Sequence, residues 1–142
     1  MLLFANLDGI LWVLRQEMIY NPQFVKIFSL EEQAKLQDKG FNKQEQKIDN
    51  SKTVYRELKE SLKFTLECYA KQWKLDDYQF PNNKEWQAMC KAIQIRHDIT
   101  HPKDIKLKIT DNDLRAVMQA KEWFGEQAMK PFVDHAIKLN QK

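Results

Sequence analysis

The chain has 142 residues, a length typical of one domain, and we expect a single domain over residues 1–142. Hydrophobic residues make up 43% and charged residues 30%, which excludes a disordered or collagen-like chain. Three glycines and four prolines are too few for the many turns of an all-β domain, so the composition favours long helices. The formal net charge of +3 is too small, taken alone, to indicate a nucleic-acid binder.

The first expected helix covers residues 3–20, where apolar residues recur at three- and four-residue steps. These residues are Leu3, Leu7, Ile10, Leu11, Leu14 and Met18. The stretch is too short to cross a bilayer and has no basic start, so the sequence predicts a cytoplasmic protein without membrane contact. Ser29 and Glu32 have the spacing of a capping box and predict a short helix that ends before Gly40.

The polar residues 42–52 lack periodicity and are expected to form a mobile loop. A second long helix is expected over residues 52–73, and its apolar stripe is Val54, Leu58, Leu62, Leu66, Tyr69 and Trp73. Asn82, with Glu85 three residues later, predicts the start of a third helix. Because a residue before proline avoids the α region, Pro102 predicts that this helix stops around Thr100.

A fourth helix is expected to begin at Thr110 or Asp111, with Pro131 kinking or restarting it. Its expected apolar face is Leu114, Val117, Met118, Phe124 and Ala128. The four tryptophans stand at helical spacing among leucines and are expected in the core; they are Trp12, Trp73, Trp86 and Trp123. The pattern predicts an all-α fold, an antiparallel bundle of about four to five helices.

Cys68 and Cys90 are the only cysteines, and they are far apart in the sequence. This usage fits a reducing compartment, where they act as small apolar residues on helix faces, although a disulfide between them stays open. The histidines and cysteines follow no zinc-ligand spacing, and three isolated glycines cannot build a phosphate-binding loop. The sequence therefore predicts neither a metal nor a cofactor.

Chemistry-bearing side chains gather in residues 95–103, at the expected end of the third helix. Arg96 lies five residues before His101, which on a helix is about 140° of rotation. A helix that ends at Thr100 lets His101 turn back toward Arg96. An imidazole exchanges protons near neutral pH, and a guanidinium stabilises charge on phosphate oxygens. Because RNA carries its own 2′-hydroxyl nucleophile, such a pair can cleave it without a metal and leave a 2′,3′-cyclic phosphate.

A structural interpretation stands beside this one. Histidine at a helix C-terminus often serves only as a cap, and Arg96 can simply pair with a carboxylate. An arginine and a histidine at this spacing also arise easily by chance, so spacing alone favours the structural role.

Residues 95–103 resemble the signature of the HEPN superfamily, small all-helical domains with an Arg-x4-6-His motif at the end of the third core helix. Arg96 and His101 match the motif, and His97 is the polar residue after the arginine. The resemblance implies a metal-independent endoribonuclease of the toxin or phage-defence type, a homodimer with a composite cleft, and a cognate antitoxin. It implies that His101 is the general base or acid, that Arg96 binds the scissile phosphate, and that His97 assists.

Basic residues surround the motif, since residues 84–108 hold six basic and three acidic residues. The candidates for RNA-backbone contact are Lys91, Lys103, Lys106 and Lys108. Lys103 stands where one subgroup of the family has a tyrosine, so the chain departs from that subgroup. Some HEPN domains have lost catalysis, and the alternative function is a non-catalytic helical module that binds RNA or protein or mediates dimerisation.

Overall fold

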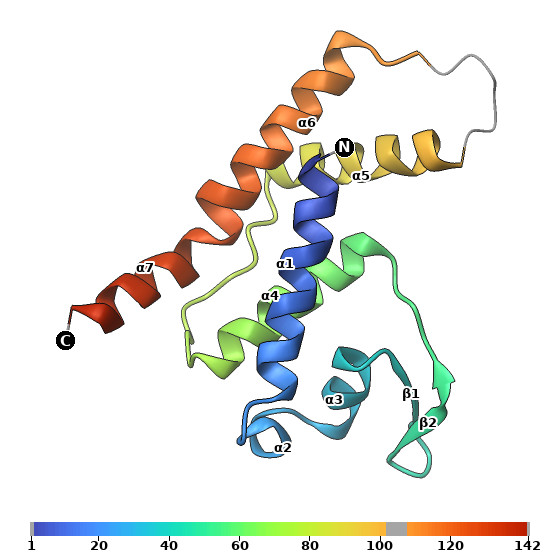
Figure 1. Ribbon diagram of the computed structural model, residues 1–142, viewed down its shortest axis with the longest axis vertical. Helices are drawn as coiled ribbons and strands as arrows, with labels where there is room; N and C mark the ends of the chain where they lie inside the picture. Colours follow the sequence, from blue (N-terminus) through green and yellow to red (C-terminus); the bar gives the residue numbers. More distant parts are fainter. Residues whose placement is uncertain (1, 102–107, 142) are drawn as a thin grey trace. The chain divides into compact units, whose positions relative to one another are not determined.

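The computed structural model describes residues 2–101 and 108–141, which are mostly helical (Figure 1). In chain order the elements are α1 (Leu2–Ile19), α2 (Phe24–Ile27), α3 (Leu30–Leu36), β1 (Lys39–Asn42), β2 (Lys47–Thr53), α4 (Leu58–Gln72), α5 (Lys84–Thr100), α6 (Asp111–Trp123), the π-helix η1 (Phe124–Ala128) and α7 (Lys130–Asn140). The chain divides into two compact units, Leu2–Tyr78 and Gln79–Lys142. The single domain over residues 1–142 stays a prediction.

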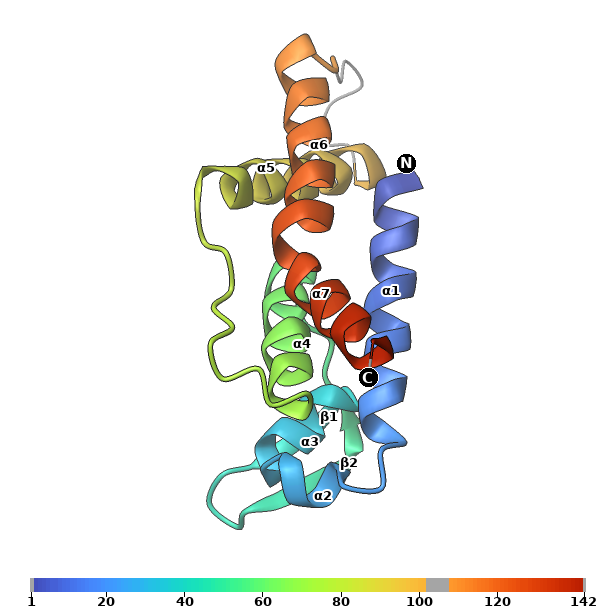
Figure 2. The same ribbon diagram turned by 90° about the vertical axis from the view of Figure 1, so that its left-hand side faces the viewer.

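In the first unit, α1 packs against α4 (Figure 2). The buried face of α1 is the predicted one, with Leu7, Leu11 and Met18 almost fully enclosed, and the helix bounds confirm the prediction. Side chains pair in ascending order, because Arg15 Nη2 donates to Ser61 Oγ at 3.0 Å and Tyr69 Oη donates to Glu17 at 2.9 Å. The two helices are therefore parallel, whereas an antiparallel arrangement was expected.

The parallel pairing is made possible by a β-hairpin that returns the chain to the start of α4. The prediction of a mobile loop over residues 42–52 is wrong. Phe41 pairs with Ile48, and Asn42 pairs with Lys47, in an antiparallel ladder. The Asn42 side chain accepts hydrogen bonds from the backbone N–H groups of Gln44 and Glu45, both at 3.0 Å, which closes the turn. Strand pairing extends to residue 53, so the second helix starts at Leu58 rather than at the predicted residue 52.

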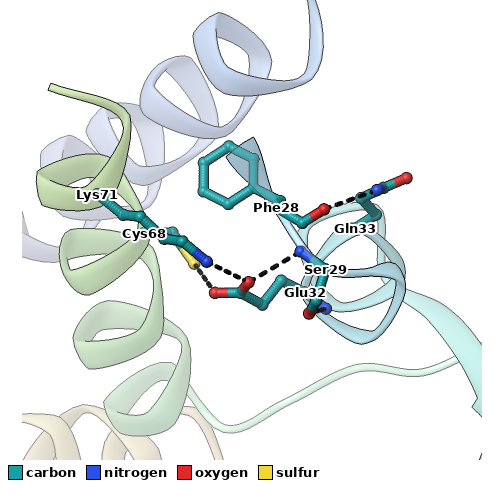
Figure 3. A network of polar contacts seen from close by, with 6 residues as sticks. All are labelled: Phe28, Ser29, Glu32, Gln33, Cys68 and Lys71. Carbon is teal, nitrogen blue, oxygen red and sulfur yellow. Dashed lines mark hydrogen bonds and ion pairs between the residues drawn. The ribbon is translucent and has the colours of Figure 1, made fainter. Parts of the chain in front are cut away.

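An apolar cluster in the same unit joins α1 to α2, α3 and α4; its buried members are Met18, Phe24, Phe28, Leu36 and Cys68. At its edge lies the predicted capping box of α3, in which Ser29 and Glu32 exchange hydrogen bonds of 2.9 and 3.2 Å (Figure 3). Glu32 also accepts from Lys71 Nζ at 2.7 Å and from the thiol of Cys68 at 4.0 Å. A single carboxylate thus connects α3 to α4.

Burial raises the pKa of Cys68 to about 12, and the carboxylate of Glu32 adds to this shift. The thiol is therefore a neutral core group. Both cysteines are free, so the disulfide that the sequence left open is not formed, and the interpretation as small residues on helix faces is confirmed.

In the second unit, α5 and α6 pack against each other. Trp86 and Trp123 pack with ring centroids 5.0 Å apart, and Phe80 meets both rings edge-on. The indole Nε1 of Trp123 donates to the carbonyl of Pro81 at 3.0 Å. The N-cap of α5 is Asn83, one residue after the predicted Asn82, because it is the Asn83 side chain that accepts from the backbone N–H of Trp86.

The end of this unit follows the local sequence signals. Thr110, one of the two predicted caps, is the N-cap of α6, and Asp113 completes a capping box that was not predicted. Pro131 stands in the first turn of α7, so the chain restarts a helix there after the π-helical turn.

The prediction that all four tryptophans lie in the core is wrong for two of them. Trp86 and Trp123 are buried, but Trp12 is 63% and Trp73 is 36% exposed. Leu114 and Met118, expected on the buried face of the fourth helix, are also exposed. Among the described residues, no helix combines the length and apolarity needed to cross a membrane.

Trp123→Ala should lower the free energy of unfolding by about 3–5 kcal/mol, since it removes a fully buried ring from the aromatic cluster and leaves the Pro81 carbonyl without its donor. Urea denaturation followed by circular dichroism measures the change. Trp12→Ala is the matched control and should change stability by about 0.5 kcal/mol or less, because Trp12 is exposed. Equal losses in both variants would contradict the assignment of Trp123 to the core.

Burial raises the pKa of Glu32, but the hydrogen bonds from Lys71 and Ser29 outweigh it, so the pKa lies below its ordinary value of 4.5. A lowered pKa stabilises the fold above the unfolded-state value, and this stabilisation is lost as the pH falls through the folded-state value. Glu32→Gln keeps a capping-box residue and removes only the charge. We expect it to cost about 1 kcal/mol or less at pH 7, since the ion pair is partly exposed.

The loss in free energy of unfolding caused by Glu32→Gln should disappear progressively below about pH 4.5. Urea denaturation of the wild type and of Glu32→Gln over a series of pH values measures it. Glu31→Gln, in the same turn of α3, is the matched control. A cost of Glu32→Gln that stays constant from neutral to acid pH would show that the charge is not its cause.

Candidate functional site

The candidate site is the C-terminal end of α5, which stops at Thr100 as predicted. The backbone of His101, with φ −129° and ψ 66°, has left the α region, although its N–H still donates to the carbonyl of His97 at 2.9 Å. The hydroxyl of Thr100 is shared between the carbonyls of Arg96 and His97, at 3.0 and 3.1 Å. The carbonyl of His97 thus accepts from both the backbone N–H of His101 and the hydroxyl of Thr100.

The two histidines of the motif lie side by side at this end. Their ring centroids are 5.1 Å apart with the planes tilted by 50°, and both side chains are exposed. Arg96, the residue before His97, is half-buried. The structure therefore brings His97 and His101 together; the prediction that His101 faces Arg96 across one pocket stays a prediction.

The remaining polar residues of the motif have structural partners. Gln94 Nε2 donates to Asp98 Oδ1 at 2.9 Å, one turn along α5. The hydroxyl of Thr100 donates to helix carbonyls and so acts as a cap of α5. Gln94 was not identified from the sequence, although its spacing of four residues from Asp98 is the usual spacing of such pairs on a helix.

The four candidate lysines differ in their surroundings. Lys91 Nζ lies 3.8 Å from the carboxylate of Asp113, so part of its charge is neutralised across the contact between α5 and α6. Lys108 is exposed shortly before α6. Lys103 and Lys106 lie outside the described residues. Asp113 was recognised from the sequence neither as a capping residue nor as the partner of Lys91.

Chemically, the end of α5 offers two exposed imidazoles and, one position before His97 in the chain, the permanent charge of the Arg96 guanidinium. Imidazoles supply proton transfer near neutral pH, and the guanidinium supplies a fixed donor for oxyanions. Among the residues that the structure describes, no group of three or more histidine, cysteine, aspartate or glutamate side chains is arranged to hold a metal ion.

Comparison with protein-family models, with curated proteins and with solved structures finds no match for this chain. The function therefore has to be argued from the chemistry of the site.

Proposed function

We propose that the protein is a metal-independent endoribonuclease of the HEPN type whose active site is the end of α5. The observation that carries the proposal is the adjacent, exposed pair of imidazoles of His97 and His101, directly after Arg96 in the chain. Exposed residues at a helix end contribute little to the core, so burial does not account for this combination of side chains.

In the proposed reaction, His101 takes the proton from a 2′-hydroxyl of RNA. The 2′-oxygen forms a bond to the adjacent phosphorus, the bond from phosphorus to the 5′-oxygen breaks, and the 5′-oxygen receives a proton. Arg96 stabilises the negative charge that grows on the non-bridging oxygens, and His97 orients the phosphate. The products carry a 2′,3′-cyclic phosphate and a 5′-hydroxyl.

The geometry of displacement supports a dimeric active site. The attacking and leaving oxygens lie on opposite sides of the phosphorus, roughly in line. Two imidazoles only 5.1 Å apart on one helix end approach the phosphate from the same side. A second copy of the motif, from a partner molecule, is a source of the proton for the leaving oxygen, which agrees with the homodimer implied by the HEPN resemblance.

The charge around the motif supports an RNA substrate. Between residues 84 and 108 the basic residues outnumber the acidic ones by three, the whole net charge of the chain. Lys108 is exposed and free to contact a phosphate backbone, whereas Lys91 must share its charge with Asp113. We further propose a cytoplasmic toxin or defence role with a cognate antitoxin, in line with the same resemblance.

The decisive experiment is RNA cleavage in EDTA by the wild type and by Arg96→Ala and His101→Ala. Each variant should lose about 100-fold or more of the rate, because each removes either proton transfer or charge stabilisation. Cleavage should leave 2′,3′-cyclic phosphate ends and should fail on 2′-O-methyl RNA and on DNA. Arg115→Ala, at an exposed position of α6, is the matched control and should cleave at the wild-type rate.

Circular dichroism must show that the variants are folded. Cleavage of 2′-O-methyl RNA at the normal rate, or full activity of His101→Ala, would exclude the proposed mechanism. A folded wild type that binds RNA in a salt-dependent manner without forming product would instead support the non-catalytic binding module.

The proposed composite site predicts that the protein is a dimer in solution. Light scattering after size exclusion should give twice the 17.0 kDa of one chain for the wild type and for folded His101→Ala. A chain that cleaves RNA while it is monomeric at the same concentration would show that one motif is sufficient and would refute the composite cleft.

A further inference from the structure

A hollow of about 480 Å³ lies in the first unit, at the common C-terminal end of the parallel helices α1 and α4. Its lining residues are Glu17, Tyr20, Asn21, Pro22, Gln72 and Trp73. The volume is within the range of pockets that bind small ligands or single side chains. None of these residues belongs to the motif at the end of α5.

An exposed carboxylate lines this hollow. Glu17 accepts a hydrogen bond from the hydroxyl of Tyr69 at 2.9 Å and a longer one from Gln72 Nε2 at 3.5 Å. Burial raises the pKa of Tyr69 to about 12, and the hydrogen bond to Glu17 adds to this shift, so the phenol remains a donor at neutral pH. The carboxylate is thus oriented by two neutral groups.

The charge of Glu17 is not balanced within the described part of the chain. The ion pairs there join other carboxylates to their cations, such as Asp38 to Arg15 and Glu32 to Lys71, and none of them includes Glu17. An oriented but unbalanced carboxylate beside an apolar wall favours a cationic ligand.

Aromatic rings form part of the wall. Tyr20 is 80% exposed, and Trp73 is 36% exposed and meets Tyr69 edge-on at 6.2 Å. Core packing does not account for the exposure of the Tyr20 ring, whereas Trp73 is partly packed on Tyr69. The faces of tryptophan and tyrosine are the surfaces on which organic cations bind.

The helix ends and the side-chain amide of Gln72 also favour a cationic ligand. α1 ends at Ile19 and α4 ends at Gln72, so the negative ends of two helix dipoles lie at the hollow. The Oε1 atom of Gln72 is buried and has no hydrogen-bond partner among the described residues. A ligand with N–H donors would offer that acceptor a partner after a small rotation of the amide.

We propose that this hollow binds an organic cation with N–H donors, a guanidinium or primary ammonium group, between the rings of Tyr20 and Trp73 and against the carboxylate of Glu17. The cation is carried either by a basic side chain of a protein segment or by a free amino or guanidino compound. Both sources present the same group to the site, and the experiment separates them.

Isothermal titration with N-acetyl-arginine-N-methylamide tests the protein source, and titration with agmatine tests the free compound. The neutral citrulline analogue keeps the shape of the arginine probe and removes its charge. We expect the wild type to bind the citrulline analogue at least about tenfold more weakly than the arginine probe. We also expect Glu17→Gln to bind both cations at least about tenfold more weakly than the wild type does. Trp73→Leu should weaken cation binding about threefold or more. Glu60→Gln, an exposed glutamate on α4, is the matched control and should bind like the wild type.

Because Glu17 and Tyr69 link α1 to α4, circular dichroism must first show that Glu17→Gln is folded. The indole N–H resonance of Trp73, assigned with Trp73→Leu, should shift on addition of the arginine probe and stay unchanged with the citrulline analogue. Equal binding of charged and neutral probes, unchanged affinity in Glu17→Gln, or no binding of either cation would overturn the proposal. RNA cleavage should be the same in Glu17→Gln and wild type, so this test is independent of the nuclease assay.

Discussion

The proposed nuclease depends on how α5 ends. A helix C-terminus carries partial negative charge, which repels phosphate, so an anion site there must supply its own positive groups. The hydroxyl of Thr100 covers the carbonyls of Arg96 and His97 and thereby weakens the negative character of this end. The next residue after His101 in the sequence is Pro102, and a residue before proline avoids the α conformation. Both imidazoles are therefore presented at the terminated end of the helix, and Arg96 is the residue in the sequence that can supply the positive charge that anion binding requires.

The opposite end of α5 fixes the helix without involving the motif. Asn83 caps the first turn, and Trp86 packs on Trp123 while the indole of Trp123 is tied to the Pro81 carbonyl. Trp86 precedes Arg96 by ten residues, or about 15 Å along the helix, and the buried residues of α5 all lie before Arg96. Substitutions at the motif should report on chemistry rather than on stability, a separation that a buried histidine pair would not allow.

Local signals in the sequence were sufficient wherever a side chain and the backbone next to it determine the structure. The capping box of α3, the N-cap of α6, the end of α5 and the restart at Pro131 are of this kind. The hairpin was missed because its strands are polar and its turn depends on the Asn42 side chain rather than on glycine. Trp12 and Trp73 follow helical periodicity, yet they are exposed, because periodicity marks a face and not what covers it. Likewise, the motif residues and the neighbouring lysines were evident, but the contact of Lys91 with Asp113 depends on tertiary packing.

The two proposed sites have opposite electrostatic requirements. At the end of α5, Arg96 and a basic tract offset one negative helix end, and the result favours a phosphate. At the end of α1 and α4, two negative helix ends are reinforced by Glu17, and the result favours a cation. A helix terminus alone therefore does not determine which ion binds; the side chains placed on it do. We expect that RNA does not compete for the hollow and that a cation does not occupy the motif, because each proposed site repels the ligand of the other.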